Sequence, residues 1–571
     1  MSNEKFIIMN TKIYKRKWLC KALFTLHSSL FTSVALISSL FTSVGLTSCS
    51  DNWNDHYDAS TQDNGTLWQA ISSQQELSNF AKVAKACGYD QVLDGSQTYT
   101  VFAPTNATLT ATLADSLISE YQSQQLAGTR TNDNTVVRQF LQNHISLYKH
   151  PVSSLTNDSI TMMNDKYAVL TSSALAGRQL LSTNALFNNG LLFTIDKQLD
   201  YFPNVFEYLK HDNDLNSVYQ FLNSFSVYEF NDAKSVPGEI VDGQTVYLDS
   251  VSDLRNSVLE RYGLINSEDS TYWMLCPTNS EWDRLVSEYE PYFNYPLNTS
   301  KRDSLIYTNT RLAILSGAFF SRTTNSDEAF RDSAVSTQAS PLTTHYSPLT
   351  TNYYTFYKPF DEGGIFHGAS DVACSNGHLL KSDKWPVSKY ETFAQTIVTE
   401  GENNMMQDTI INAVDPLTIR EVLQNNPYHD KVSGNAYVEV APETPTGRVI
   451  VGFKMPNLLS NLKYDVYAVF VPATAGDTLA VEETTKPLRV TCRIRQLDQN
   501  GVITSPPFRN AKNVSTATVD AVKMLSGVQL TTCSYGLSNA TTKFEIQSNT
   551  DGATLRLDCI YFTPTGLMNN E

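Results

Sequence analysis

The sequence predicts a multidomain fold, with two α+β domains followed by an all-β sandwich or jelly-roll domain. A chain of 571 residues is too long for a single hydrophobic core. A pair of sequence landmarks occurs twice in the same order, which indicates a duplicated domain. Beyond about residue 390 the segments alternate in the manner of strands. We therefore assign 65–203 and 204–388 to two copies of one domain, and 389–571 to the β-domain.

The first landmark is Tyr99-Thr-Val-Phe-Ala-Pro-Thr-Asn106, which recurs as Tyr272-Trp-Met-Leu-Cys-Pro-Thr-Asn279. The second is Asn-Gly-x-Leu, which begins at Asn189 and again at Asn376. This pairing resembles the fasciclin domain, a module of extracellular adhesion proteins whose hallmark segments are T-V-F-A-P-T-N and N-G-x-[ILV]. The resemblance implies that each copy is a small β-wedge covered by helices. It also implies a role in adhesion and not in catalysis.

The first copy begins with a helix and a strand. Apolar residues at helical spacing predict a helix that Gly88 ends, namely Leu77, Phe80, Ala81, Ala84 and Cys87. A strand over Tyr99–Ala103 ends at Pro104, which cannot continue a β-ladder. We expect Thr105 or Asn106 to cap the helix that follows, since either side-chain oxygen can accept a free amide of the first turn.

Two later segments of the first copy carry further landmarks. Val136–Ile145 predicts a helix that contains Asn143-His144, and fasciclin domains often carry such a pair here. His144 has the chemistry of a general base, but its place on a helix beside Asn143 favours a buried hydrogen-bonding residue. Asn188-Asn189-Gly190 predicts a hairpin with a type I′ turn, because Asn-Gly tolerates positive φ angles.

The second copy departs from this pattern. It has about 50 residues between Leu222 and Tyr272, where the first copy uses about a dozen. Its equivalent of Asn143-His144 is Leu315-Ser316-Gly317-Ala318, so the histidine is missing. We interpret residues 204–388 as a divergent fasciclin-like copy.

The β-domain offers the main candidates for ligand binding. Its inner strand Tyr464–Phe470 and its last strand, ending at Pro564, loosely resemble galactose-binding-like domains of surface glycan proteins. Sugar sites combine an aromatic face with polar groups that satisfy the hydroxyls. Residues 390–571 contain no Trp, so the stacking candidates are tyrosines: Tyr428, Tyr437, Tyr464 and Tyr535. The lack of Trp equally favours a domain that contacts protein.

The amino terminus indicates the compartment. A basic stretch (12–21) precedes an apolar run (22–46), and the run ends at Leu46-Thr-Ser-Cys49. Leu-x-Ser-Cys resembles the bacterial lipobox, which implies a signal peptide over 1–48 and lipidation at Cys49. The acidic polar tether over 49–64 resembles the surface-export signal of Bacteroidota lipoproteins. The alternative is a retained transmembrane helix, since about 25 such residues could span a bilayer.

Charge and motif content exclude several function classes. The net charge is −16, of which the first 48 residues carry +5 and the remainder −21. Such an acidic body repels phosphate backbones, so we expect no nucleic-acid partner. The sequence lacks HExxH, GxSxG, a phosphate-binding loop and a Cys/His set at zinc spacing, so we expect no enzyme, cofactor or metal. Spacing alone leaves open a carboxylate pair for glycoside cleavage.

Two residue classes complete the sequence-based expectations. Of the eight cysteines, the six beyond Cys49 are expected as core thiols, since none forms a CxxC pair and Cys87 and Cys276 sit in apolar patterns: Cys87, Cys276, Cys374, Cys492, Cys533 and Cys559. Asp-Ser/Thr followed by an apolar residue or Thr resembles the O-glycosylation sequon of exported Bacteroidota proteins. It occurs at Ser116, Ser159, Ser250, Ser270, Ser304, Ser333, Thr409 and Thr478.

These observations predict a lipid-anchored, surface-exposed protein of the cell outer membrane. Its expected role is adhesion, or accessory binding of a glycan or surface protein beside a polysaccharide-uptake system. One alternative is a structural spacer that presents the carboxy-terminal domain. Another is a component of a glycan-degrading enzyme system.

Overall fold

The computed structural model describes residues 64–567, apart from 234, 242, 323–325, 340–352, 481–487, 538 and 540. The signal peptide, Cys49 and nearly all of the tether lie outside the described residues. Residues from Asn64 onward fold as one compact unit. No helix in the described part of the chain has the length and apolar character needed to cross a bilayer.

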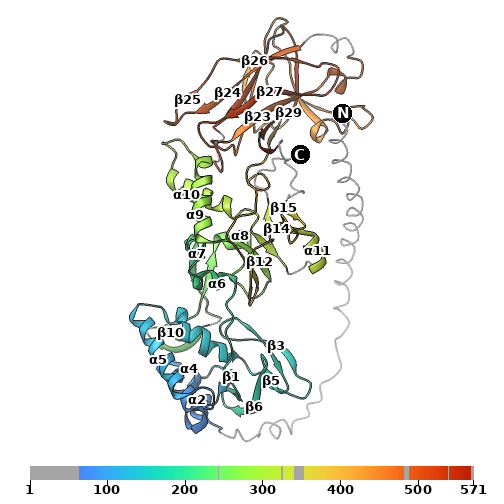
Figure 1. Ribbon diagram of the computed structural model, residues 1–571. Coiled ribbons are helices and arrows are strands. Elements are labelled where there is room, and N and C mark those ends of the chain that lie inside the picture. The colour runs from blue at the N-terminus through green and yellow to red at the C-terminus, as the bar shows by residue number, and fades with distance from the viewer. Residues whose placement is uncertain are drawn as a thin grey trace, which may run out of the picture. The chain divides into compact units, whose positions relative to one another are not determined.

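Helices and a seven-stranded sheet build the first copy. The longer helices are α2 (Leu67–Ser73), α3 (Ser78–Ala86), α4 (Tyr89–Asp94) and α5 (Ala111–Leu126). The sheet has the order β2-β1-β7-β6-β5-β4-β3. Its strands are β1 (Tyr99–Pro104), β2 (Ile145–Leu147), β3 (Asn157–Thr161), β4 (Tyr167–Thr171), β5 (Ala174–Leu175), β6 (Arg178–Phe187) and β7 (Gly190–Ile195). The helices gather on one side of β1 and the strands β3, β5 and β6 extend on the other (Figure 1).

Several sequence predictions for the first copy are confirmed. Gly88, at φ 79°, ends the helix α3 that the apolar spacing predicts, and β1 covers the predicted strand. The helix expected over 136–145 is present as far as His144, as a π-helical turn (Val136–Leu141) and a 3-10 turn (Gln142–His144), and Ile145 begins β2. The predicted cap at Thr105 or Asn106 is wrong. The cap of α5 is Thr110, because the chain makes one further turn before that helix begins.

The second copy has a smaller sheet of order β13-β12-β17-β16. These strands are β12 (Tyr272–Pro277), β13 (Phe319–Ser321), β16 (Ser370–Cys374) and β17 (Gly377–Ser382). The helices are α6 (Val205–His211), α7 (Asn216–Asn223), α8 (Ser257–Tyr262), α9 (Asn279–Tyr289), α10 (Arg302–Ile314) and α11 (Asp327–Asp332). Three hairpin-like pairs are added: β8 (Ser226–Phe230) with β11 (Ser252–Asn256), β9 (Val236–Val241) with β10 (Gln244–Asp249), and β14 (Ser333–Ala339) with β15 (Tyr353–Tyr357).

The two landmarks meet in the same way in both copies. β1 runs parallel to β7, with Tyr99 opposite Gly190, and β12 runs parallel to β17, with Tyr272 opposite Gly377. A Cβ at Gly190 would lie 2.0 Å from the Tyr99 carbonyl oxygen, and one at Gly377 would lie 1.8 Å from that of Tyr272. Close approach of two backbones therefore requires glycine at both positions.

The asparagine before each glycine ties the strand pair to a helix. The Asn189 side-chain oxygen Oδ1 accepts from the Leu67 backbone amide at 2.8 Å, while the side-chain nitrogen Nδ2 donates to the Leu93 and Gly95 backbone carbonyls at 2.8 Å each. Asn376 makes the equivalent three bonds at 2.8–2.9 Å. Gly190 pairs with Phe187, so the predicted hairpin is present. Neither Asn188 nor Asn189 is among the residues with positive φ, so the expected type I′ turn is wrong.

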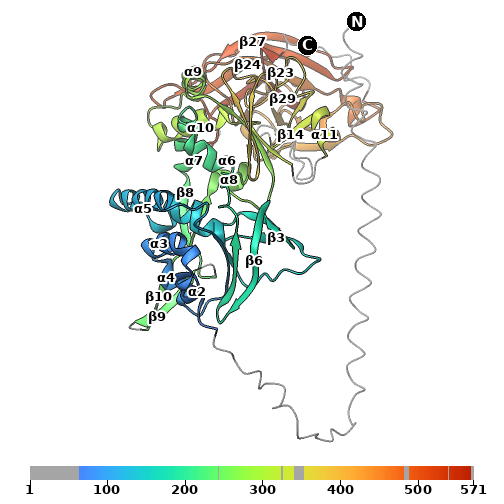
Figure 2. The ribbon, with the colours of Figure 1, turned by 60° about the horizontal axis from the view of Figure 1, so that its bottom comes forward.

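Two six-stranded sheets form the β-domain. One has the order β20-β21-β29-β23-β27, with β18 also on β29, and the other has β19-β22-β28-β24-β25, with β26 also on β24. Figure 2 shows β23, β27 and β29 together, with β24 of the facing sheet beside them. The strands are β18 (Ile397–Glu400), β19 (Gln407–Ile411), β20 (Thr418–Glu421), β21 (Ala436–Val440), β22 (Ile450–Lys454), β23 (Lys463–Phe470), β24 (Leu488–Leu497), β25 (Ile503–Thr504), β26 (Arg509–Val514), β27 (Asp520–Gln529), β28 (Lys543–Ser548) and β29 (Leu555–Pro564).

Buried side chains divide the described residues into unequal cores. The first copy holds two clusters, one containing Phe80 and Tyr99, which Val236 of the second copy joins, and the other containing Phe102 and Phe193. The second copy and the β-domain instead share one continuous cluster, which runs from Val205 to Phe562. All six cysteines are free thiols, and all except the half-buried Cys374 are buried. The expectation of core thiols is confirmed for those five.

Candidate functional site

The structure places two of the four predicted stacking tyrosines in the interior. Tyr437 and Tyr464 are both 0% exposed. Tyr464 lies in the sandwich core at 5.9 Å between ring centroids from Phe562, and its hydroxyl accepts from the Leu459 amide at 3.1 Å. Tyr437 packs in a separate small cluster with Val422 and Val471. Neither ring offers a face to a sugar, so the prediction for these two residues is wrong.

The other two predicted tyrosines are half-buried. The Tyr428 hydroxyl donates to the Ala517 carbonyl at 2.7 Å, which fixes this loop tyrosine at the edge of the domain. Tyr535 packs edge-to-face on Phe293, with ring centroids 5.4 Å apart. Phe293 belongs to the second copy, so Tyr535 fills the seam between that copy and the β-domain. The four tyrosines therefore do not form one surface.

A different tyrosine pair lies on the outer face of the sandwich. Tyr467 on β23 is opposite Tyr561 on β29, and the rings stack with centroids 4.8 Å apart and planes 12° from parallel. Both residues are half-buried. Strand alternation could have pointed to Tyr467, because Asp465 and Tyr467 are two residues apart and so share one face of the strand. The sequence analysis missed it by selecting Tyr464 instead.

Charged groups surround this pair. Lys523 on β27 lies 5.2 Å from the centroid of the Tyr467 ring and donates to Asp465 at 2.8 Å. Asp465 also accepts from the Ser526 hydroxyl and the Gly527 amide, both at 2.9 Å. Burial opposes ionisation of Asp465, but these bonds hold its pKa below the usual value. The face thus places a stacked aromatic pair beside a fixed ion pair.

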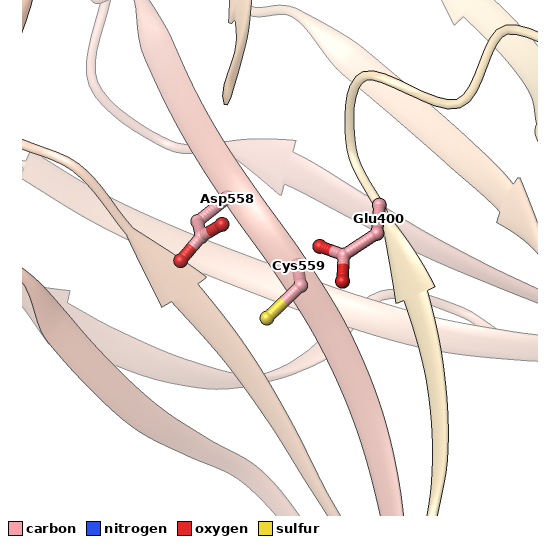
Figure 3. Close-up of side chains that lie close together, drawn as sticks. All are labelled: Glu400, Asp558 and Cys559. Carbon is pink, nitrogen blue, oxygen red and sulfur yellow. The ribbon is translucent and has the colours of Figure 1, made fainter. Parts of the chain in front are cut away.

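Beside this face lies a buried acidic cluster (Figure 3). Asp558 and Cys559 are on β29 and Glu400 is on the neighbouring β18, and one ligand atom from each lies within 4.8 Å of the others. Asp558 is 2% exposed, and its two carboxylate oxygens accept from the Ser433 amide at 3.0 Å. The Ser433 hydroxyl donates to Glu400 at 2.9 Å. The sequence analysis missed this cluster because Glu400 and Asp558 are far apart along the chain.

The electrostatics of the cluster favour a bound proton. Burial, together with the neighbouring charges of Glu400 and Glu402, raises the pKa of Asp558 to about 8, although the bond from the Ser433 amide acts to lower it. Burial also raises the pKa of Cys559, so its thiol stays neutral at neutral pH. Calcium takes six to eight oxygen ligands. The grouped residues supply two carboxylates and a thiol, so we assign no metal to them.

His144 has a structural environment. Its Nδ1 lies 2.7 Å from the Phe140 carbonyl, and its Nε2 accepts from the Leu199 amide at 2.9 Å. Burial lowers its pKa to about 4, so the ring is neutral at pH 7. Because both nitrogens are engaged in a fully buried site, His144 is the hydrogen-bonding residue that the sequence favoured.

The sequon residues differ in accessibility. Those with exposed side chains are Ser116, Ser159, Ser250, Ser304 and Thr478, whereas Ser270, Ser333 and Thr409 are half-buried. The Thr409 hydroxyl donates to Glu545 at 3.0 Å, and the Glu545 side chain is 0% exposed. A glycan at Thr409 would break this bond, so the exposed positions are the better acceptors.

Comparison with known proteins identifies one segment. Residues 75–201 match the model of the Fasciclin domain. The chain is also similar to the solved FAS1 domain pair of the insect cell adhesion molecule Fasciclin I, at 14% identity and a TM-score of 0.18, over 56% of this chain and 98% of that one. No curated protein matches the chain.

Carbohydrate-binding modules are also among the solved structures that are similar to part of the chain. The CBM22-1–GH10 modules of a Clostridium thermocellum xylanase are 12% identical, with a TM-score of 0.21, over 30% of this chain and 29% of that one. The xylan-binding CBM22-1 domain of Paenibacillus barcinonensis Xyn10C is also 12% identical, with a TM-score of 0.19, over 30% of this chain and 94% of that one.

The match to the Fasciclin domain over residues 75–201 confirms the fasciclin resemblance for the first copy, which carries the letter-for-letter motif.

Proposed function

We propose that this protein is an outer-membrane lipoprotein that acts in adhesion at the cell surface. The observation that carries the proposal is the Fasciclin domain over residues 75–201, a module whose function is of the adhesion type. The second copy repeats the strand pairing of the first, with Gly377 in the place of Gly190. Two such modules in series extend the surface available to a partner.

The anchor is Cys49, with surface export directed by the acidic tether. Each buried methylene of an acyl chain contributes about 0.8 kcal/mol, so one chain holds marginally and several hold stably. We expect Cys49→Ala to block acyl labelling and to release the protein from the membrane fraction. Acyl labelling that persists in this variant would contradict the anchor.

The β-domain is the proposed ligand-binding part, with a glycan favoured over a protein. Its support is the stacked Tyr467–Tyr561 pair beside the Asp465–Lys523 ion pair. One or two stacked rings on an open face give a weak site, on the order of −4 to −6 kcal/mol, or millimolar to high-micromolar affinity. This surface replaces the tyrosines that the sequence analysis selected.

Calorimetry of the full chain against surface and dietary polysaccharides tests the glycan proposal. Tyr467→Ala removes one ring of the stack and should weaken binding by about fivefold, since an aromatic stack contributes on the order of 1 kcal/mol. Tyr428→Ala, at the domain edge, is the matched control and should bind as the unchanged protein does. Absence of heat with every polysaccharide would move the domain to the class that contacts protein.

Two rival functions make different predictions. A spacer would bind neither glycan nor protein through the β-domain, and adhesion would survive the loss of Tyr467. A component of a glycan-degrading system would release shorter products from a polysaccharide. Incubation of the full chain with each bound glycan, followed by chromatography of the products, distinguishes an enzyme from a binding protein.

A further inference from the structure

The sheet that contains β22, β28 and β24 carries a row of cations on its outer face. In the strand register, Lys543 on β28 lies between Lys454 on β22 and Arg495 on β24. Residues opposite each other on neighbouring strands share a face. Phe544 and Ile494, which neighbour the row along the strands, are buried in the shared core, so the row faces outward. Because like charges directly opposite each other are destabilising, such a row needs anionic partners.

A buried glutamate organises the next row of the same face. The side chain of Glu545, two residues from Lys543, is 0% exposed although it lies on the outer face. It accepts from Arg493 at 2.5 Å and from Arg495 at 3.0 Å. Gly452, opposite Glu545 on β22, leaves room for this side chain, because a Cβ there would lie 2.8 Å from the Glu545 Cγ. The carboxylate is therefore held against the sheet and fixes both guanidinium groups.

Both arginines have donors beyond those that Glu545 uses. Arg493 donates to Glu545 through Nε, and its guanidinium lies 4.3 Å from the centroid of the Phe508 ring. Arg495 donates to the Ser505 hydroxyl through Nε at 2.9 Å and to Glu545 through one terminal nitrogen. A guanidinium has five N–H donors, and these side chains are 21% and 25% exposed. Each arginine thus has N–H groups that no described residue takes up.

The two rows carry more positive than negative charge. Four cations pair with two carboxylates, Glu545 and Asp408, so these six groups have a net charge of +2. Lys543 donates to Asp408 at 2.7 Å, and Lys454 donates weakly to the Met405 carbonyl at 3.4 Å. Burial opposes ionisation of both carboxylates, but bonds from the cations hold their pKa values below the usual range. These residues form the cationic face of the β-domain, on a protein whose net charge is −16.

The size of the charge excess favours one class of anionic ligand. Arginine binds carboxylate, sulfate and phosphate groups through paired N–H bonds. An excess of two charges is small beside the four to eight basic residues of a typical lipid-binding cluster, about the number that membrane recognition takes. It is also small beside the roughly six to ten phosphate contacts of a nucleic-acid complex. One or two acidic groups on a short stretch of polysaccharide match it.

We propose that the cationic face binds acidic sugar units of a polysaccharide, through the carboxylate of a uronic acid or through a sulfate ester. The two arginines donate to the anionic group, and the two lysines stabilise it electrostatically. Salt screens charges beyond about 8 Å, so the acidic remainder of the protein does not cancel this attraction. The Tyr467–Tyr561 pair lies on the other sheet, so the two faces are separate. The choice of a glycan as the carrier rests on the function proposed for the β-domain.

Isothermal titration of the full chain in detergent tests the proposal. Trigalacturonate supplies carboxylates, a κ-carrageenan tetrasaccharide supplies sulfates, and galactotriose is the neutral counterpart. We expect at least one acidic probe to bind. Arg495→Gln should weaken its binding at least about tenfold, because hydrogen bonds to charged groups are the stronger ones. Lys454→Gln should weaken it by about threefold, as for a surface charge. Raising NaCl from about 0.1 M to about 1 M should weaken it further, through screening.

Three controls separate charge, geometry and fold. Arg495→Lys keeps the charge and removes the planar fork, so its affinity should lie between those of Arg495→Gln and the unchanged protein. Lys82→Gln removes the same charge from an exposed ion pair with Asp115 in the first copy, and should bind as the unchanged protein does. Thermal unfolding of each variant identifies any loss of fold. The one hydrogen bond of the Lys454 ammonium among the described residues is weak, so Lys454→Gln tests the face even if Arg495→Gln is unstable.

Several outcomes would overturn the proposal. These are binding of neither acidic probe, acidic binding that Arg495→Gln and Lys454→Gln leave unchanged, and an equal loss in Lys82→Gln. Tighter binding of a thymidylate dodecamer than of either acidic sugar would assign the face to nucleic acid instead. Neutral polysaccharides test the Tyr467–Tyr561 face separately. Their failure to bind, with acidic binding that depends on Arg495, would overturn only the function proposed for that face.

Discussion

The two copies differ in what surrounds the same strand pair. In both, an asparagine before a glycine makes three short hydrogen bonds that join the parallel strands to a preceding helix. In the first copy, His144 then ties the sheet to Leu199. In the second copy the strand register puts Ala318 at that position, and the residue before it is Gly317, at φ 77°, whose amide donates to the Gln338 side chain at 2.7 Å. The motif thus specifies the strand pair and leaves its surroundings free to diverge.

The surroundings decide how each copy is stabilised. The first copy encloses its own clusters, whereas the second shares its core with the β-domain. The insertion that lengthens the second copy packs against the first copy, because Val236 of β9 is buried in the cluster that contains Phe80. Arg130 of the first copy lies 3.6 Å from the ring centroid of Tyr228 in β8. The difference teaches that a repeated motif does not produce repeated folding units.

The largest expected effect tests this separation of cores. Phe102 is fully buried and stacks on Phe193 with centroids 5.0 Å apart. Phe102→Ala should lower the free energy of unfolding of the first copy by about 3–5 kcal/mol, through lost burial and a cavity. Leu275→Ala should lower stability by about 2–5 kcal/mol and affect the second copy and β-domain together. Chemical denaturation followed by limited proteolysis of each region measures both.

Leu186→Ala is the control for that experiment, since Leu186 is 53% exposed on the same sheet and should change stability by less than about 0.5 kcal/mol. A loss below about 1 kcal/mol for Phe102→Ala would contradict the burial of the strand. A β-domain that keeps its stability in Leu275→Ala would break the comparison, because the shared core would then not be cooperative.

The asparagine ties should matter equally in both copies. Asn189→Ala and Asn376→Ala each leave a buried amide and two carbonyls without partners, at a cost of about 1–3 kcal/mol. Because the six bonds are nearly equal in length, the two losses should agree within about 0.5 kcal/mol. Urea unfolding of both variants measures this. Clearly unequal losses would mean that the motif depends on its surroundings.

Acid should weaken the first copy through His144. Its folded pKa is about 4, below the usual 6.5, so only the unfolded chain binds this proton in between. Stability contributed by the neutral ring is present above about pH 6.5 and is lost towards pH 4, at up to about 1.4 kcal/mol per pH unit. His144→Gln should remove that slope from thermal melts of the first copy. The same slope in the variant would show that another group titrates.

Asp558 should make the stability of the β-domain fall with rising pH, which is opposite to the effect of His144 in the first copy. Its folded pKa is about 8, above its usual value of 3.8, so the folded state holds a proton that the unfolded chain releases. Stability is therefore full below about pH 4 and falls as pH rises towards 8, by at most about 1.4 kcal/mol per pH unit. Asp558→Asn, measured in EDTA beside the unchanged protein, should be flat over this range. An unchanged slope would exclude the buried carboxyl as its source.

Local features of the fold were predictable because their causes are local. Gly88 ends a helix and Pro104 ends a strand for reasons carried by single residues. The cap at Thr110 was not predicted, since three Ser/Thr/Asn residues (Thr105, Asn106 and Thr108) stand closer to β1, and the choice among them depends on where the chain turns. Asn106 instead joins the end of β1 to the segment before α3, because its side-chain nitrogen donates to the Gln75 backbone carbonyl at 2.8 Å.

The sequence by itself determined the duplicated landmarks, the strand-rich third region and the acidic body, because these follow from spacing, periodicity and charge. Only the tertiary structure decided which tyrosines face outward, because alternation along β23 puts Tyr464 and Tyr467 on opposite faces but does not determine which face the second sheet covers. Only it brought Glu400 to Asp558, joined the second core to the β-domain and assembled the cationic face. Such contacts join residues far apart in the chain, and their energies depend on burial that no local pattern encodes.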